Sequence, residues 1–493
     1  MTGPAFWSGA AAAAMLGLTQ AMTPALGVGP PLVTAEPTLL SGEALDPTSG
    51  VALEMGGSGV PIPPESLVQV AFQNYLVPNG YGDYTPQALF TPEGLYPLTG
   101  VNVLKFDTSV AQGVTILNDA IKAALDAGHN VVVGGVSQSA TIASIEMQDV
   151  ANGSLGFQPS PGQLAFAMLG DPSNPNGGIL ERFDLPTPGS HPVIPSLGLT
   201  FSGATPADTG FENNIYTLEY DGFADFPRYP LNILSDINAV LGFELVHPLY
   251  IRGYVGPGVG LTPDQIQTEA MTLPTTPGYD GGTTYHIIPF TGRLPLDQVI
   301  EAIAGKPVAD LLEPDLKVLV NLGYGADPSI GWSESPANVP TPIGLFPSID
   351  AHQFAAILQA LVSGAQQGVQ AFVSDVSDPS SGAPVAVPTA LPTVDLTDLP
   401  SFLQVADAYS SVLADATATL LPTADLLISL TTTVPAEDIS LFGYYLGHGD
   451  LLDAVGMPIA TDAGLATVAA GEEFAVLATA LDHIETALSG LFS

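Results

Sequence analysis

The chain of 493 residues has room for two or three domains, and 46% apolar residues supply enough material for a large core. Forty-nine acidic residues against eight basic ones give a formal charge of −41, which repels phosphate backbones and excludes nucleic-acid binding. Cysteine is absent, which excludes disulfides, thiolate metal sites and a cysteine nucleophile.

The N-terminal region contains an apolar, alanine-rich stretch at 10–18 that is typical of the central part of a secretory signal and too short for a membrane span. The basic residues that usually precede such a stretch are missing, since the first basic residue is Lys105. We expect a secreted or cell-envelope protein; the alternative is a loosely packed N-terminal arm. Proline, glycine and threonine at 19–50 predict a linker.

The middle of the chain alternates between β-branched runs and amphipathic segments. This progression predicts an α/β fold with a parallel sheet and right-handed crossovers. A segment rich in proline and glycine at 170–210 predicts a loop, placed over the active site. We expect strands at 51–55, 101–106, 131–133, 165–169, 215–220, 284–288 and 316–322, and helices at 66–76, 110–125, 140–150 and 231–241.

The stretch at 130–143 predicts a nucleophile elbow, a sharp turn between a strand and a helix with a serine at its apex. Small residues must lie two positions before and after the apical residue, and Gly135 and Ser139 satisfy this around Ser137. The turn exposes the Ser137 hydroxyl and leaves the amide of Gln138 free to bind an oxyanion. The alternative is a serine in an ordinary strand–helix loop.

A second turn of small residues, Gly56–Gly59, follows the first expected strand. Serine hydrolases often place the second oxyanion donor at such a position, so Ser58 is the candidate. A plain surface loop would have the same composition.

An acid and a base follow the serine in the order expected for α/β hydrolases. Asp221 and Asp225 come after the strand at 215–220, and His247 is the first histidine downstream of them. Histidine can accept a proton from serine when a carboxylate holds its other ring nitrogen. A single histidine in a loop usually has no special role, and His286, inside an apolar strand pattern, reads as a packed histidine.

From about residue 345 the pattern becomes helical, with helices expected at 351–376, 400–420 and 463–491 and a linker at 377–399. These helices are nearly free of basic residues, which argues against electrostatic binding to a membrane surface. We expect them to pack on the hydrolase core or on a partner. No phosphate-binding loop, His-Glu-x-x-His or calcium loop is present, so we expect neither a cofactor nor a metal.

Several motifs together resemble the PE-PPE domain, a mycobacterial-type α/β-hydrolase domain related to cutinases. The resemblance covers about 50–345, and the helical tail resembles the C-terminal extension of such proteins. The chain departs from the best-known members of this family at its N-terminus, where we recognise no separate PE or PPE helical module. The motifs are Met55–Gly59, Gly135–Ser139, Tyr220–Asn232, His247 and Asn321–Gly325, of which Tyr220–Asn232 is the most specific.

The resemblance implies that Ser137 is the nucleophile and His247 the base, because cutinases have a His-x-x-Tyr string that His247–Tyr250 reproduces. It favours Asp225 over Asp221 as the acid, because 222–225 is the nearer match to the acid motif of cutinases. It also supports Gln138 as an oxyanion donor, with Ser58 as the second.

The expected chain therefore has a signal-like segment and linker at 1–50, a PE-PPE-type hydrolase domain at 51–345 and a helical extension at 346–493. The expected activity is hydrolysis of carboxylic esters of acyl lipids through an acyl-enzyme. Two alternatives remain: transfer of acyl groups between cell-envelope glycolipids, and a non-catalytic envelope protein that uses the hydrolase fold for interaction.

Overall fold

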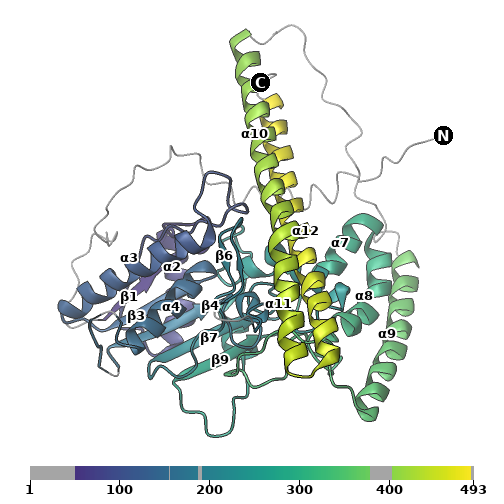
Figure 1. Cartoon of the computed structure of the whole chain (residues 1–493), viewed down its shortest axis with the longest axis horizontal. Helices are drawn as coiled ribbons and strands as arrows, with labels where there is room; N and C mark the ends of the chain where they lie inside the picture. Colours follow the sequence, from purple (N-terminus) through teal and green to yellow (C-terminus); the bar gives the residue numbers. More distant parts are fainter. Residues whose placement is uncertain (1–49, 155, 161, 187–190, 378–401, 490–493) are drawn as a thin grey trace.

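The computed structural model describes residues 50–154, 156–160, 162–186, 191–377 and 402–489. The signal-like segment and most of both expected linkers lie outside these residues. Within them, a central sheet is flanked by helices, and helices also make up the C-terminal region (Figure 1). The predicted fold class is confirmed.

The central sheet has the strand order β2-β1-β3-β4-β7-β9-β8. All neighbouring strands run parallel except β8, which pairs antiparallel with β9 at one edge. A small hairpin, β5 with β6, lies in the predicted loop segment. The strands are β1 (Val51–Glu54), β2 (Thr85–Ala88), β3 (Val131–Val136), β4 (Leu164–Leu169), β5 (Val193–Ile194), β6 (Leu199–Thr200), β7 (Glu212–Leu218), β8 (Met271–Thr272) and β9 (Thr283–Ile288).

The helices cover both faces of this sheet and continue into the C-terminal region. Short 3-10 and π segments (η1–η5) interrupt or extend several of them. The α-helices are α2 (Glu65–Ala71), α3 (Phe106–Asp126), α4 (Gln138–Ala151), α5 (Ile179–Arg182), α6 (Ile233–Leu245), α7 (Pro295–Ala304), α8 (Lys306–Asn321), α9 (Ala351–Ser377), α10 (Phe402–Ile428), α11 (Val434–Gly447) and α12 (Leu451–Ser489).

The buried strand β3 shows how the sheet is held between layers. Val131 and Val133 pack in one core cluster with residues of α3 and α4, whereas Val132 packs on the opposite face with Phe72 and Leu76 of η1 (Phe72–Leu76). Successive side chains of a strand point to opposite faces, so a β-branched run that is apolar at every position requires cover on both sides.

The strand expected at 101–106 is wrong. These residues form turns that lead into α3, which begins at Phe106. The strand in this part of the chain is β2, whose Thr-Pro-Gln-Ala sequence lacks a β-branched run. It lies at the edge of the sheet beside β1, where Pro86 is tolerated because an edge residue can do without a backbone donor.

The strand expected at 316–322 is also wrong, because most of this run is the end of helix α8. A short apolar run cannot be assigned to strand or helix from its periodicity alone. Pro314 lies inside the helix and interrupts the sequence pattern that would have revealed it. The other expected strands and helices of the sheet region are confirmed.

The C-terminal helices α10 and α12 form a long pair that projects from the body, with α11 alongside (Figure 1). Within the described residues, one segment, Leu451–Leu481 of α12, is long and apolar enough to cross a membrane by length and composition. The same helix contacts α6 of the sheet region, so it is also part of the packed structure.

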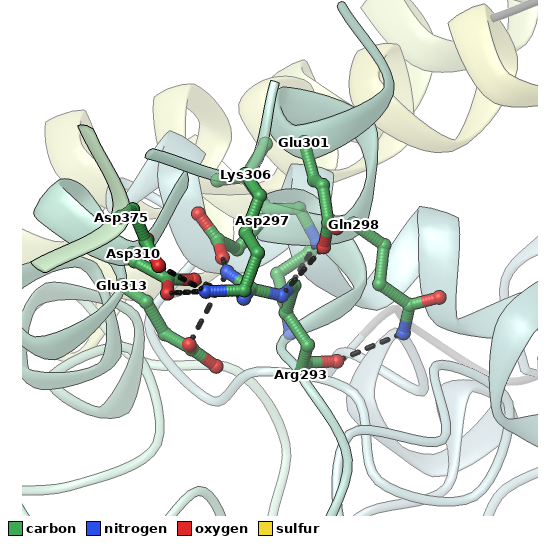
Figure 2. A network of polar contacts seen from close by, with 10 residues as sticks. Arg293, Asp297, Gln298, Glu301, Lys306, Asp310, Glu313 and Asp375 are labelled. Atoms are coloured by element: carbon green, nitrogen blue, oxygen red, sulfur yellow. Dashed lines mark hydrogen bonds and ion pairs between the residues drawn. The ribbon is translucent and has the colours of Figure 1, made fainter. Parts of the chain in front are cut away.

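An arginine surrounded by carboxylates links α7 to α8 (Figure 2). The guanidinium of Arg293 makes ion pairs with Asp297 and Asp310, with Glu301 at 2.8 Å and with Glu313 at 3.3 Å. Lys306 bridges Asp310 to Asp375, which lies on α9. Two of the protein's eight basic residues therefore hold three helices together.

Candidate active site

Ser137 occupies the sharp turn between β3 and α4. Its backbone angles, φ 60° and ψ −122°, lie in a region that residues other than glycine rarely adopt. A Cβ on Gly135 would lie 2.7 Å from the carbonyl oxygen of Ser139, so only glycine allows the helix to approach the strand this closely. The predicted strand–turn–helix geometry is present.

Ser139 stands where the commoner motif has glycine, and its hydroxyl stabilises the turn. The Ser139 Oγ accepts a hydrogen bond from the amide of Val136 at 2.8 Å and lies 3.0 Å from the Val136 carbonyl oxygen, to which it donates. The side chain is buried, so these bonds are shielded from water.

The two residues proposed to bind an oxyanion lie side by side, because the Ser58 hydroxyl donates a hydrogen bond of 3.1 Å to the Gln138 side-chain carbonyl. Neither the backbone amide of Ser58 nor the backbone amide of Gln138 donates a hydrogen bond to another residue of the described chain. A Cβ on Gly57 would lie 3.2 Å from the Ser137 Cβ, which places this loop directly against the serine.

A third segment, Glu93–Gly94, supports Gln138 and the turn that carries Ser58. The sequence did not indicate this segment. The Gln138 side-chain amide donates to the Gly94 carbonyl at 3.0 Å, and the Gly59 amide donates to the Glu93 carbonyl at 2.7 Å. Glu93 has φ 49°. Burial raises the pKa of its carboxyl to about 8, against a weaker lowering by a hydrogen bond from Thr91. No local pattern marks this loop, because it acts through contacts distant in sequence.

His247 is held by the buried carboxylate of Asp221. Its Nδ1 lies 2.8 Å from Asp221 Oδ2 and 2.9 Å from Oδ1. Two further donors reach this carboxylate, the Tyr250 hydroxyl at 2.8 Å and the Phe223 amide at 3.0 Å. The carboxylate is fully buried, and these donors compensate its charge and fix its orientation.

Two glycines bring this histidine to Asp221. A Cβ on Gly222 would lie 2.0 Å from the Ala239 carbonyl oxygen, and one on Gly242 would lie 2.1 Å from that of Tyr220. Helix α6, which ends just before His247, therefore packs backbone to backbone against the turn that carries Asp221.

Asp225 does not contact His247, so the preference for Asp225 over Asp221 is corrected by the structure. Its amide donates to the Asp221 carbonyl at 2.6 Å, and its carboxylate accepts from the Tyr220 amide at 3.1 Å. Burial raises the pKa of Asp225 well above its usual value, although the Tyr220 amide and the charge of the buried Arg182 act in the opposite direction. The Asp225 side chain therefore stabilises the turn at 220–225 by its hydrogen bond with the Tyr220 amide.

The serine and the histidine lie at the same edge of the sheet. The Ser137 amide donates to the carbonyl of Leu169, the last residue of β4, at 2.9 Å. A Cβ on the next residue, Gly170, would lie 3.0 Å from His247 Cε1 and 3.1 Å from Asp221 Oδ2. Residues from β3, β4 and the segment after β7 therefore converge at the C-terminal edge of the strands, where ligands bind in open α/β sheets.

A mainly apolar cavity opens beside Ser137, and its empty space, counted together with its opening to solvent, is about 930 Å³. Ser58, Ser137 and Gln138 all line it. Phe223 also lines it and contacts the His247 ring edge-on, with ring centroids 4.8 Å apart. The His247 Nε2 is buried and makes no hydrogen bond to any described residue, Ser137 included.

His286 lies apart from this group, in β9. It stacks on Tyr216, with ring centroids 4.4 Å apart, and burial lowers its pKa to about 4. It packs as the sequence indicated. In the described part of the chain, no group of three or more histidine or acidic side chains is placed to hold a metal ion.

Comparison with known proteins agrees with this architecture. The PE-PPE domain model matches residues 82–325. The chain is 41% identical to the PE family protein PE3 of Mycobacterium tuberculosis over 71% of this chain and 68% of that protein. The chain belongs to the PE-PPE domain family. No solved structure matches it.

Four other relatives from Mycobacterium tuberculosis match the chain, and three of them have names that state an activity. The uncharacterized PPE family protein PPE28 is 43% identical over 90% of this chain and 67% of its own length. The esterase PE16 is 45% identical over 60% of this chain and 51% of its own length. At 28% identity the chain also matches proteins named SL1278 acyltransferase Chp1 and diacyltrehalose acyltransferase Chp2. The chain spans between about half and four fifths of these relatives.

Proposed function

We propose that the protein hydrolyses carboxylic esters of acyl lipids through an acyl-enzyme on Ser137. The observation that carries this proposal is a strained serine at an elbow that lines the cavity, at the same sheet edge as a histidine whose Nδ1 is held by a buried carboxylate and whose ring contacts Phe223 of the cavity lining. The name of the relative PE16 supports the esterase class.

In the proposed first step, the Ser137 oxygen attacks the ester carbonyl carbon while His247 Nε2 accepts the hydroxyl proton. Asp221 keeps the imidazole oriented and stabilises its positive charge. The amides of Ser58 and Gln138 bind the developing oxyanion. His247 then returns the proton to the leaving alcohol, and water attacks the acyl-enzyme by the same route in reverse.

The test is a Ser137→Ala variant assayed with p-nitrophenyl butyrate. We expect turnover to fall by at least ~10³-fold, with the thermal unfolding midpoint unchanged, because the hydroxyl contributes to chemistry and not to packing. A fluorophosphonate should label wild-type protein at Ser137 and leave the variant unlabelled. Wild-type turnover in the variant would remove Ser137 from the reaction, and failure to label the wild type would favour a non-catalytic interaction protein.

Acyl transfer is the second candidate, because two relatives are named acyltransferases. Both reactions share the acyl-enzyme, and they differ in whether water or an alcohol accepts the acyl group. Incubation with an acyl donor and a sugar acceptor, followed by mass spectrometry, separates the two. A new sugar ester at the expense of free acid would favour transfer, and free acid alone would favour hydrolysis.

We further propose that the protein works outside the cytoplasm, in the cell envelope or secreted. The family relatives and the expected signal-like segment support this location. The mass of the protein recovered from culture supernatant, compared with that from cells, tests both export and cleavage.

A further inference from the structure

The cavity beside Ser137 is built from two parts of the chain that are far apart in sequence. One part belongs to the matched family domain and the segment before it and surrounds the candidate catalytic residues. The other part lies more than 90 residues beyond residue 325, the end of the family match. Its lining residues come from α10, η5 (Ser429–Thr433), α11 and α12 and are Leu426, Ser429, Leu430, Val434, Leu465, Val468, Ala469 and Glu472.

Glycines of helix α12 let its backbone approach side chains of the sheet region closely. A Cβ on Gly471 would lie 2.3 Å from Val240 Cγ1 of α6, and one on Gly464 would lie 2.7 Å from the Phe183 ring. The intervening turns of α12 carry Val468 and Ala469 at the cavity. The position of this wall is therefore set by packing on the same helix, α6, that leads to His247.

Hydrogen bonds hold the end of α10 and the following segment η5 at the cavity rim. The Tyr96 hydroxyl donates to Asp425 of α10 at 2.8 Å, and the hydroxyl of Ser196 is hydrogen-bonded to that of Ser429. Neighbours of these residues on both sides, Leu95 and Leu197 in the domain and Leu426 and Leu430 in the helices, line the cavity.

The chemistry of the cavity fits an alkyl chain. Most of its lining side chains are apolar, the exceptions being Ser58, Ser137, Gln138, Ser429 and Glu472, so a hydrocarbon chain can be buried along it. One carboxyl interrupts the C-terminal wall: desolvation raises the pKa of Glu472 to about 7, so this wall carries little charge in mildly acidic solution.

We propose that the C-terminal helices form one wall of an acyl-chain binding site, so that α10–α12 select the length of the acyl chain delivered to Ser137. This inference rests on the proposed ester chemistry at Ser137 and adds a substrate class, esters of long acyl chains. Because each buried methylene strengthens binding by about fourfold, kcat/KM should rise with chain length until the site is full.

The test compares Ala469→Phe with Ala470→Phe. Ala469 lines the cavity, whereas Ala470, the next residue of α12, is exposed, so the first variant adds a ring at the cavity and the second adds the same ring toward solvent. We expect Ala469→Phe to lower the ratio of kcat/KM for p-nitrophenyl laurate to that for the acetate by at least ~10-fold. Ala470→Phe should match the wild type with both esters.

Active-site labelling separates this proposal from the proposed function. A methyl-substituted fluorophosphonate should label Ser137 equally fast in both variants, and a dodecyl-substituted one should react more slowly with Ala469→Phe only. Equal rates with both probes would overturn the acyl-chain wall and leave the serine chemistry standing, whereas failure of the wild type to be labelled would overturn the proposed function.

A second variant guards against misfolding of Ala469→Phe, which its unfolding midpoint would reveal. Val468→Ala removes two methyl groups from the same wall. We expect it to lower the ratio of kcat/KM for the laurate to that for the acetate by at least ~4-fold. An unchanged ratio of laurate to acetate in this variant would contradict the proposal.

Discussion

At the scale of single residues, two aspartates four positions apart have opposite surroundings. Asp221 faces His247 and accepts hydrogen bonds from the Tyr250 hydroxyl and the Phe223 amide. Asp225 turns its carboxylate back to the Tyr220 amide. Both are almost completely buried, so burial does not distinguish them. The two aspartates differ in the group that each carboxylate contacts.

This difference predicts different effects of the same substitution. Asp221→Asn should lower kcat for an ester by ~10³-fold or more, because a carboxamide neither stabilises the imidazolium nor enforces the required tautomer. Asp225→Asn should leave kcat close to that of the wild type, measured below its unfolding midpoint. Equal losses in the two variants would contradict the assignment of Asp221.

Tyr250 positions Asp221. Its hydroxyl also accepts a hydrogen bond of 2.7 Å from the Leu218 amide. Tyr250→Phe should lower kcat roughly tenfold with little change in KM, because the carboxylate loses one charge-assisted hydrogen bond. Tyr75→Phe is the matched control, since the Tyr75 hydroxyl donates only to the Tyr250 carbonyl. If both variants behave alike, Tyr250 has only a packing role.

At the scale of elements, glycines allow a helix to pack closely against the backbone of another segment, both beside the candidate active site and between α8 and α9. Gly242 does so where α6 meets the turn that carries Asp221. Gly368 of α9 does so against α8, where a Cβ would lie 2.1 Å from the Leu311 carbonyl oxygen. The ion pairs of Arg293 and Lys306 lie in this second assembly (Figure 2).

We expect Arg293→Met to destabilise the α7–α8–α9 assembly by about 2 kcal/mol, seen as a fall in the unfolding midpoint of several degrees, because buried Asp297 loses its counter-charge. Lys306 and Arg293 donate hydrogen bonds to Asp310, and these outweigh desolvation and lower the pKa of Asp310 to about 2. The stability that the ionised Asp310 contributes should therefore persist above pH 4 and disappear as the pH falls toward 2. The more exposed Lys306→Met should have a smaller effect. Calorimetry of both variants checks the order.

At the scale of the whole molecule, the excess of acid extends into the interior. Burial raises the pKa of Glu54 and Asp236 to about 8, and that of Glu181 to about 8 with a further contribution from Asp184. The folded state therefore binds protons that the unfolded chain releases between about pH 4.5 and 8. Stability from these groups is complete below this window and decreases as the pH rises through it.

The protein should accordingly unfold at a lower temperature at pH 9 than at pH 6. Glu54→Gln should reduce this loss by on the order of 2 kcal/mol, or roughly 2 °C, because a carboxamide cannot ionise. Asp119→Asn is the matched control on the exposed side of α3. Scanning calorimetry at the two pH values decides: parallel curves for the wild type and Glu54→Gln would show that Glu54 is not protonated in the fold.

Sequence alone was enough to predict the features that depend on local pattern. The valine run of β3, the small residues around Ser137 and the apolar spacing in α3 act over fewer than 20 residues and indicate an elbow and a parallel sheet directly. The order of serine, acid and histidine also follows from reading along the chain.

Tertiary structure alone decided which carboxylate reaches His247, because that depends on how α6 packs against the turn at 220–222. It also decided that Thr85–Ala88 is an edge strand, since pairing with β1 and not intrinsic preference forms it. The tertiary structure likewise decided that the C-terminal helices form the second wall of the cavity and that Glu93–Gly94 supports Gln138. They join segments that are distant in sequence, and local propensity carries no information about which of them meet.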